Sequence, residues 1–264
     1  MNRTGQQREI IVLGSGTSVG VPVIGCECKT CTSDHPRNNR MRCSIAIPIG
    51  EQWVIVDTPP EIRLQLVREK IPLVHATLFT HAHADHIFGL DDLRICGHRL
   101  DAPVPLYCEE PVEKALRKSY YYAFGNEAPI NPHKFALPRL RFERIGLEPF
   151  ELFGQEIRPL RLMHGKLPVL GFRVGDVAYC TDVSMIPEET WPHLEGLDTL
   201  ILDALRHEPH TTHFNVEQAL EVVERVKPKQ TYFTHLACML EYEETNAELP
   251  DGVELAYDGL RVPF

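Results

Sequence analysis

The chain of 264 residues lacks any apolar run near the roughly 20 residues that a membrane-spanning helix needs. Its first residues, MNRTGQQREIIVLGSG, contain no long apolar segment before a small-residue cleavage site, so we expect no secretory signal peptide. Positive charge is also scarce, since 27 Lys and Arg face 37 Asp and Glu, a formal net charge of −10. This balance argues against broad nucleic-acid binding. We therefore expect a cytoplasmic protein that neither spans a membrane nor binds nucleic acid.

The sequence also has no internal repeat, no low-complexity tract and no long linker. These absences predict a single domain over residues 1–264, and 43% hydrophobic content is enough for a sizeable core. Strand-like stretches such as REIIVLG are followed by helical ones, of which NVEQALEVVERVKP is the clearest. Runs of strands and then helices, occurring twice, predict an α+β protein with two sheets packed face to face and helices outside.

What the sequence does have is eight cysteines and thirteen histidines. In a reducing cytosol, such cysteines are expected to be metal ligands or buried thiols rather than disulfides. The stretch GCECKTC places Cys26, Cys28 and Cys31 within six positions, which is one ligand short of a closed tetrahedral metal site. Four other cysteines fall in apolar contexts, and we expect them to be buried. They are Cys43, Cys96, Cys108 and Cys180.

The strongest signal is THAHADH, residues 80–86, which directly follows an apolar stretch. His81 and His83 are two positions apart, so they project to the same side of an extended backbone. Asp85 and His86 follow at a bend. One short segment can thus offer two imidazoles to one metal ion and a carboxylate with an imidazole to a second. Four potential ligands in six positions predict a metal site rather than a solvated loop.

This His-x-His-x-Asp-His motif after a strand resembles the signature of the metallo-β-lactamase superfamily. The resemblance implies a four-layer αβ/βα sandwich with a dinuclear metal site at one edge of its sheets. It also implies three further ligands at strand ends, and His164 in LRLMHGK, Asp182 in VAYCTD and His235 in TYFTHL stand in those contexts and in order. The resemblance implies that one ion is bound by His81, His83 and His164. The other is bound by Asp85, His86 and His235, and Asp182 bridges the two ions.

Imidazoles and carboxylates suit zinc, manganese or iron, and the sequence does not choose among these metals. Two such ions would lower the pKa of a bridging water and hold a phosphoryl or acyl oxygen. Asp57, in IVDTPP, matches an aspartate that often ends an early strand of this fold. Two roles stay open for it, which are orienting a ligand histidine or lying in a helix N-cap region.

Within the superfamily, the full carboxylate set resembles phosphodiesterases and nucleases more than true lactamases. The early cysteine cluster, with THAHADHIFGLDDLR, MHGK and FTHLAC, resembles the PhnP-like cyclic phosphate phosphodiesterases over nearly the whole chain. In that family the cluster binds a structural zinc, completed by a histidine three residues after the last catalytic histidine. Here that position is a cysteine. The implied zinc ligands are Cys26, Cys28, Cys31 and Cys238, and zinc removal would then disturb the active site through His235.

HEPHTTHFNVEQAL places His207, His210 and His213 before a helix. In the PhnP-like family, a histidine just before this helix is the acid that protonates the leaving oxygen. The best match is His213, although His207 or His210 could replace it. We therefore expect catalytic roles for His213 and Asp85.

The implied activity is hydrolysis of a small anionic phosphodiester with two divalent ions, zinc or manganese, and one structural zinc. Phosphoribosyl 1,2-cyclic phosphate is the specific substrate that the resemblance implies, and a homodimer is compatible with it. Three other functions stay open. They are a tRNA 3′-processing endoribonuclease, a PqqB-like cofactor-biosynthesis protein, and a metal-binding scaffold without catalysis. The acidic chain, which has no basic arm to hold tRNA, argues against the nuclease.

Overall fold

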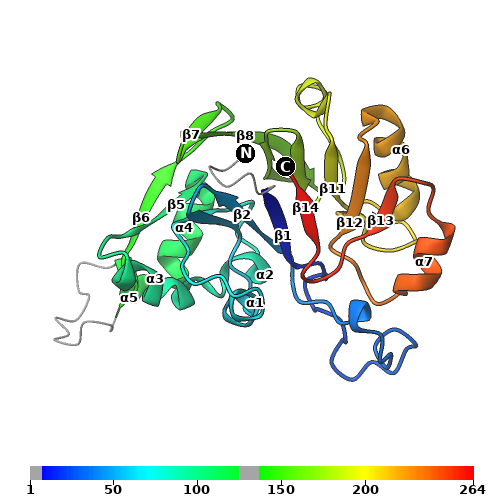
Figure 1. The fold of residues 1–264 in the computed structure, drawn as a ribbon, viewed down its shortest axis with the longest axis horizontal. Coiled ribbons are helices and arrows are strands. Elements are labelled where there is room, and N and C mark those ends of the chain that lie inside the picture. The colour runs from blue at the N-terminus through cyan, green and yellow to red at the C-terminus, as the bar shows by residue number, and fades with distance from the viewer. Residues whose placement is uncertain (1–7, 125–136) are drawn as a thin grey trace.

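The computed structural model describes residues 8–124 and 137–264, which form two seven-stranded sheets (Figure 1). The first sheet, in spatial order, is β14 (Arg261–Pro263), β1 (Glu9–Gly14), β2 (Ser44–Ile49), β3 (Gln52–Val56), β4 (Ala76–Leu78), β5 (Val104–Cys108) and β6 (Leu140–Arg144). The second, in spatial order, is β13 (Val253–Leu255), β12 (Gln230–Thr234), β11 (Thr199–Asp203), β10 (Val177–Cys180), β9 (Leu167–Val174), β8 (Gln155–His164) and β7 (Phe150–Leu152).

Two groups of helices flank these sheets (Figure 1). The α-helices are α1 (Ile62–Arg68), α2 (Ala84–Ile87), α3 (Arg94–Arg99), α4 (Glu110–Ser119), α5 (Tyr121–Phe124), α6 (Val216–Val226) and α7 (Tyr242–Glu248). Short 3₁₀ helices cover Pro36–Asn38, Leu90–Leu93 and Trp191–Leu194. None of the helices in the described ranges has the length and apolar character needed to cross a lipid bilayer.

The apolar side chains define four layers. Val12 and Ile47 of the first sheet pack with Phe172 of the second in one buried cluster, so the sheets face each other. A second cluster packs the helices α1 to α4 against the outer face of the first sheet. A third packs α6 against the outer face of the second sheet. The predicted αβ/βα sandwich is therefore confirmed, while one domain over 1–264 stays a prediction.

Helix α6 shows why the local sequence predicts its elements well. Asn215 accepts a hydrogen bond from the backbone N–H of Gln218, and the Gln218 side chain accepts one from the Asn215 backbone N–H. This capping box satisfies two otherwise unpaired donors at the start of the helix. At the other end, Lys227 adopts φ 54° before Pro228, which stops the helix. The bounds agree with the amphipathic pattern of the sequence.

Strand direction brings the predicted site residues to one edge of the sandwich. In the first sheet β3 and β4 are parallel, and in the second β10, β11 and β12 are parallel. Parallel strands have their carboxyl ends at the same edge of a sheet. Asp57 and the 80–86 motif follow β3 and β4, while Asp182 and His235 follow β10 and β12. Residues far apart in the sequence therefore meet.

Gly14 ends β1 where another backbone segment passes closely. A Cβ added there would clash with the carbonyl oxygen of Arg42 and lie 2.8 Å from that of Met41. Backbone atoms cannot move aside as a flexible side chain can. Glycine is therefore required by the close approach of these two segments.

We predict that Gly14→Ala lowers the free energy of unfolding by about 1–3 kcal/mol, because the added methyl overpacks a site bounded by backbone. Urea denaturation of the metal-loaded protein measures the change. Gly146→Ala is the matched control, since a Cβ there meets no atom of the described chain within 4 Å. Equal unfolding midpoints for the two variants would contradict the prediction.

Candidate metal centre

Three histidines form the first cluster of the site. The ring nitrogens of His81, His83 and His164 lie within 4.8 Å of one another. His164 ends β8, and the two other residues follow β4 in the THAHADH segment. His83 is exposed, while His81 and His164 are buried. The cluster therefore opens toward solvent at His83, as a metal site with an accessible coordination position would.

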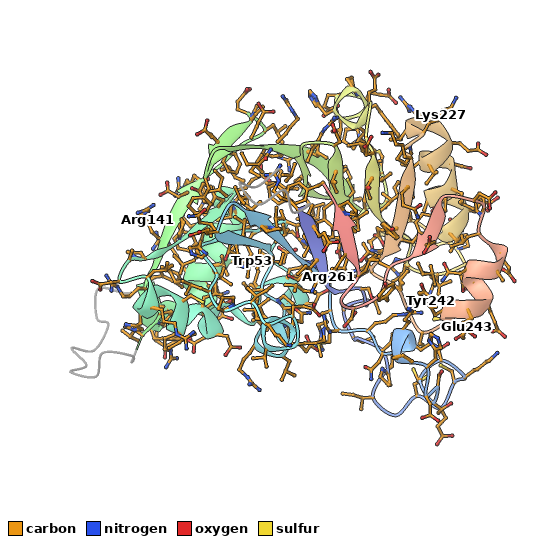
Figure 2. All side chains as sticks on the ribbon, in the orientation of Figure 1. Trp53, Arg141, Lys227, Tyr242, Glu243 and Arg261 are labelled. Carbon is orange, nitrogen blue, oxygen red and sulfur yellow. The ribbon has the colours of Figure 1, made fainter. Side chains whose placement is uncertain are left out.

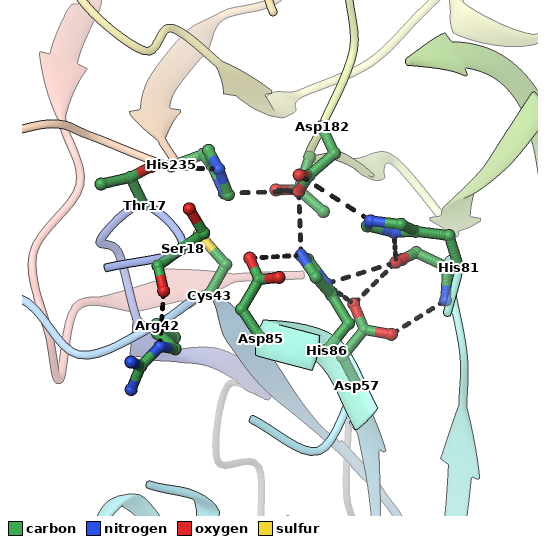
Figure 3. Close-up of polar contacts among 12 residues, drawn as sticks. Thr17, Ser18, Arg42, Cys43, Asp57, His81, Asp85, His86, Asp182 and His235 are labelled. Atoms are coloured by element: carbon green, nitrogen blue, oxygen red, sulfur yellow. Dashed lines mark hydrogen bonds and ion pairs between the residues drawn. The ribbon is translucent and has the colours of Figure 1, made fainter. Parts of the chain in front are cut away.

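The second cluster joins a pair of carboxylates to two imidazoles (Figure 3). His86 Nε2 lies 3.2 Å from both Asp85 Oδ2 and Asp182 Oδ1. His235 Nδ1 lies 3.3 Å from Asp182 Oδ1. Asp182 Oδ2 also lies 4.0 Å from His81 Nε2 of the first cluster. Asp182 thus stands between the two clusters, where a bridging ligand belongs.

The donor set fits divalent metal ions. Two buried ring nitrogens, His81 Nε2 and His235 Nδ1, have no hydrogen-bond partner in the part of the chain that the structure describes, although both point toward Asp182. Burial acts to lower the pKa of His86, but Asp182, Asp57 and Asp85 outweigh it and hold that pKa well above its ordinary value. The centre therefore attracts positive charge. A divalent cation can supply this charge to imidazole and carboxylate ligands.

Asp57 orients two of the candidate ligands. Its Oδ2 lies 2.7 Å from His86 Nδ1 and accepts a hydrogen bond of 2.8 Å from Thr80 Oγ1. Thr80 Oγ1 in turn lies 2.9 Å from His81 Nδ1. Asp57 is fully buried, and α1 begins five residues later with Glu61 as its N-cap residue. Of the two roles left open by the sequence, the contacts select the orientation of a ligand histidine.

His164 and His213 are held by one loop. The Thr212 carbonyl oxygen lies 2.7 Å from His164 Nδ1, so this nitrogen donates to it and Nε2 faces the cluster. His213 Nδ1 lies 2.7 Å from Asp203 Oδ2, which also accepts from the backbone N–H of Val183 at 2.8 Å. The His213 ring lies 4.5 Å from the His164 ring, centroid to centroid. Consecutive residues therefore orient a candidate ligand and present a candidate acid.

Asp203 is a site residue that the sequence does not single out. It is the fully buried last residue of β11, so its carboxylate reaches the edge where the other site residues gather. Burial raises the pKa of Asp203, and the nearby charge of His235 opposes that rise. The signal that could have identified it is an aspartate at the end of an apolar strand, in DTLILDAL.

The three histidines before α6 have different surroundings. His213 is buried beside the clusters and paired with Asp203. His210 is partly buried, with its ring 5.2 Å from that of His213, and its Nδ1 accepts from the backbone N–H of Thr212 at 3.3 Å. His207 is exposed. These positions favour His213 among the three histidines that are candidates for the proton donor.

A separate thiol cluster lies beyond the His235 strand end. The Sγ atoms of Cys26, Cys28, Cys31 and Cys238 lie within 4.8 Å of one another, and none of these cysteines forms a disulfide. Backbone hydrogen bonding from Cys31 lowers the pKa of Cys28 to about 7. Burial raises the pKa of Cys31 and of Cys238. The geometry nevertheless favours a metal, because four converging thiols fit a tetrahedral metal ion. The remaining cysteines are buried and free, as predicted.

We predict that Asp57→Asn lowers the affinity of the histidine centre for zinc by about 10–100-fold. An amide keeps only one acceptor oxygen, whereas the Thr80 N–H and His86 Nδ1 each use a different oxygen of Asp57. Competition with a chelator, followed by metal analysis, measures the change. Asp198→Asn is the control, since Asp198 is half exposed and pairs with Lys229 at the surface. Equal zinc affinity in the two variants would show that Asp57 does not orient a ligand.

Comparison with known proteins agrees with this geometry. Residues 52–236 match the family model of the beta-lactamase superfamily domain. The crystal structure of a new diphosphatase from the PhnP family has a TM-score of 0.91, 42% sequence identity and 98% coverage of both chains. Zinc-bound PqqB from Methylobacterium extorquens has a TM-score of 0.80 at 20% identity, covering 97% of this chain and 100% of PqqB, and so shares the fold.

An octanoyltransferase from Porphyromonas gingivalis is 34% identical over 256 residues, which cover 95% of this chain. The chain spans about 50% of the length of that transferase. The match over nearly the whole PhnP-family chain, together with the family model, establishes the relationship. The chain belongs to the metallo-β-lactamase superfamily and, within it, to the PhnP family.

Proposed function

We propose that this protein is a dinuclear metal-dependent phosphodiesterase that hydrolyses a small phosphodiester. The observation that carries the proposal is a pair of ligand clusters, both facing Asp182, beside the His213–Asp203 pair. The likeness to a PhnP-family diphosphatase supports cleavage at phosphorus. Phosphoribosyl 1,2-cyclic phosphate is the specific substrate that the sequence resemblance suggests. A complete ligand set argues against a scaffold without catalysis.

The proposed metal ligands follow the two clusters and the thiols. They are His81, His83 and His164 for the first ion, Asp85, His86 and His235 for the second, Asp182 for both, and Cys26, Cys28, Cys31 and Cys238 for a structural zinc. When bound, two divalent ions supply Lewis-acid stabilisation of phosphoryl oxygens and activate water. Zinc and manganese both suit the histidine centre, whereas four thiolates favour zinc.

The chain's own residues prepare the site for this chemistry. Asp57 and the Thr212 carbonyl fix ring orientations at His86 and His164, which preorganises the ligand nitrogens. His213 Nδ1–H donates a hydrogen bond to Asp203, so that the doubly protonated ring can transfer its Nε2 proton to the leaving oxygen and become a neutral imidazole. Asp85, the other residue with a predicted catalytic role, acts in this proposal as a ligand rather than as an acid.

A substrate panel tests the proposal. The protein loaded with zinc or manganese should hydrolyse bis-p-nitrophenyl phosphate, a 2′,3′-cyclic nucleotide or a dinucleoside diphosphate, and excess chelator should abolish turnover. Asp182→Ala is the inactive control, because it removes the shared carboxylate. No metal-dependent turnover of any small substrate would refute the proposal. Efficient cleavage of precursor tRNA would instead favour the endoribonuclease function. Inactivity on the whole panel would favour the PqqB-like function.

The proton donor is tested by the leaving group. We predict that His213→Ala lowers kcat by about 10²–10⁴-fold on a 2′,3′-cyclic nucleotide, whose alkoxide leaving group needs a proton. The decrease in kcat on bis-p-nitrophenyl phosphate should be much smaller, because p-nitrophenolate leaves without protonation. Metal content should not change. Asp203→Asn should show the same pattern with a smaller loss of kcat, since a neutral amide stabilises the protonated His213 ring less than a carboxylate does.

His207→Ala is the control, because His207 belongs to the same loop but is exposed. Equal losses of kcat on both substrates after His213→Ala would exclude His213 as the proton donor. Loss of metal from that variant would identify His213 as a metal ligand instead.

A further inference from the structure

Arg40 is a buried arginine whose guanidinium lies against the turn that carries Cys238. Its side chain is 1% exposed, and it is among the largest fully buried side chains of the described residues. Nη1 donates to the Ala237 carbonyl oxygen at 3.0 Å, and Nη2 donates to the Leu240 carbonyl oxygen at 2.6 Å. These two carbonyls belong to residues on either side of Cys238. Arg40 therefore holds the backbone of the turn both before and after Cys238.

The other donors of Arg40 also meet neutral acceptors. Nε donates to the Arg37 carbonyl oxygen and Nη2 to Asn38 Oδ1, each at 3.3 Å. Burial lowers the pKa of Arg40 to about 10, and the charges of Asp258 and Glu241 oppose the shift. The guanidinium thus stays charged at neutral pH. Its removal would leave buried carbonyl oxygens without their donors, which is costly.

Backbone pairs join the same turn to the body of the protein. Leu236 donates to the Ser15 carbonyl at 2.9 Å and accepts from the backbone N–H of Thr17 at 3.2 Å. Ala237 donates to the Leu205 carbonyl at 2.9 Å. Together with Arg40, these contacts define turn 235–240, which begins at His235 and contains Cys238. None of them involves a thiol, so the turn is built without the cysteine cluster.

The first loop, residues 22–32, has fewer hydrogen bonds to the rest of the protein than turn 235–240 has. Residues 22–32 bond mainly among themselves, as in the Thr32 N–H to Cys28 carbonyl pair of 3.1 Å. Beyond residue 33, their polar contacts with the described chain are the exposed Lys29–Glu244 ion pair and the Cys28 thiol, 4.0 Å from the Cys238 carbonyl oxygen. Figure 1 shows this loop in blue, projecting away from both sheets, and Figure 2 shows Glu243 of α7 beside it. At its base the loop is held by the backbone pair of Val21 and Arg40, and between its ends its polar contacts with turn 235–240 are made by the thiol cluster.

We infer that Arg40 is a positioning residue that builds turn 235–240, and that the thiolate metal clamps the first loop onto this prebuilt turn. On this account the metal does not hold His235 in place. Losing the thiolate metal should free residues 22–32 and leave the turn ordered. Losing Arg40 should loosen the turn itself, and with it both His235 and Cys238. The inference is independent of which substrate the histidine centre hydrolyses.

Hydrogen exchange of the full metal-loaded chain, read by mass spectrometry, tests the inference. Arg40→Gln should speed exchange in residues 235–241 by about tenfold or more, since two hydrogen bonds from a charged donor are lost. Cys28→Ser should abolish the thiolate-to-metal absorption of a cobalt-loaded sample and speed exchange in 20–34, but not in 235–241. Arg37→Gln, an exposed neighbour packed on Tyr242, should do neither.

Two results would overturn the inference. One is faster exchange at 235–241 in Cys28→Ser, equal to that in Arg40→Gln, since the metal would then build the turn. The other is unchanged exchange there in Arg40→Gln. If Arg40→Gln does not fold, Arg40→Lys replaces it, because lysine keeps the charge and can reach one carbonyl. Exchange at 235–241 should then lie above wild type, and wild-type exchange would refute the role.

Discussion

The burial of Asp182 among imidazoles is the interaction on which the rest of the centre depends. Burial acts to raise the pKa of this carboxyl, but His235, His86 and His81 outweigh it and hold the pKa well below its ordinary value. A buried anion of this kind is stable only beside positive charge, which His86, with its raised pKa, or a bound metal ion can supply. The imidazoles that contact Asp182 come from both sheets, so the two halves of the sandwich must meet at this edge for the carboxylate to be accommodated. Metal ions fit the same requirement.

Backbone conformation at the site repeats one pattern. Asp57, Asp182 and His235 all adopt positive φ, at 65°, 55° and 60°, which is unfavourable for residues with a Cβ. Each lies just after a buried strand whose hydrogen bonds and packing hold the chain in place. At this edge the side chains of all three residues contact the candidate metal ligands. Rigid strands therefore compensate for local strain at the residues that carry the chemistry.

The surrounding loops divide the remaining tasks. Residues 212 and 213 orient His164 through a carbonyl and present His213 through its contact with Asp203. On the opposite side, Arg40 and backbone pairs fix the turn that starts at His235. Preorganisation by neutral carbonyls and buried carboxylates keeps ring nitrogens directed at the centre without relying on flexible surface side chains.

The sequence by itself determined the sandwich class, through alternating strand and helix patterns, and the local group His81, His83, Asp85 and His86, through spacing within one segment. Family resemblance added the strand-end residues His164, Asp182 and His235. Only the tertiary structure revealed the contacts of Asp57 with His86 and Thr80, the pairing of Asp203 with His213, and the position of Arg40. Spacing along the chain specifies only neighbours within an element, whereas these contacts depend on which strands lie side by side and where each one ends.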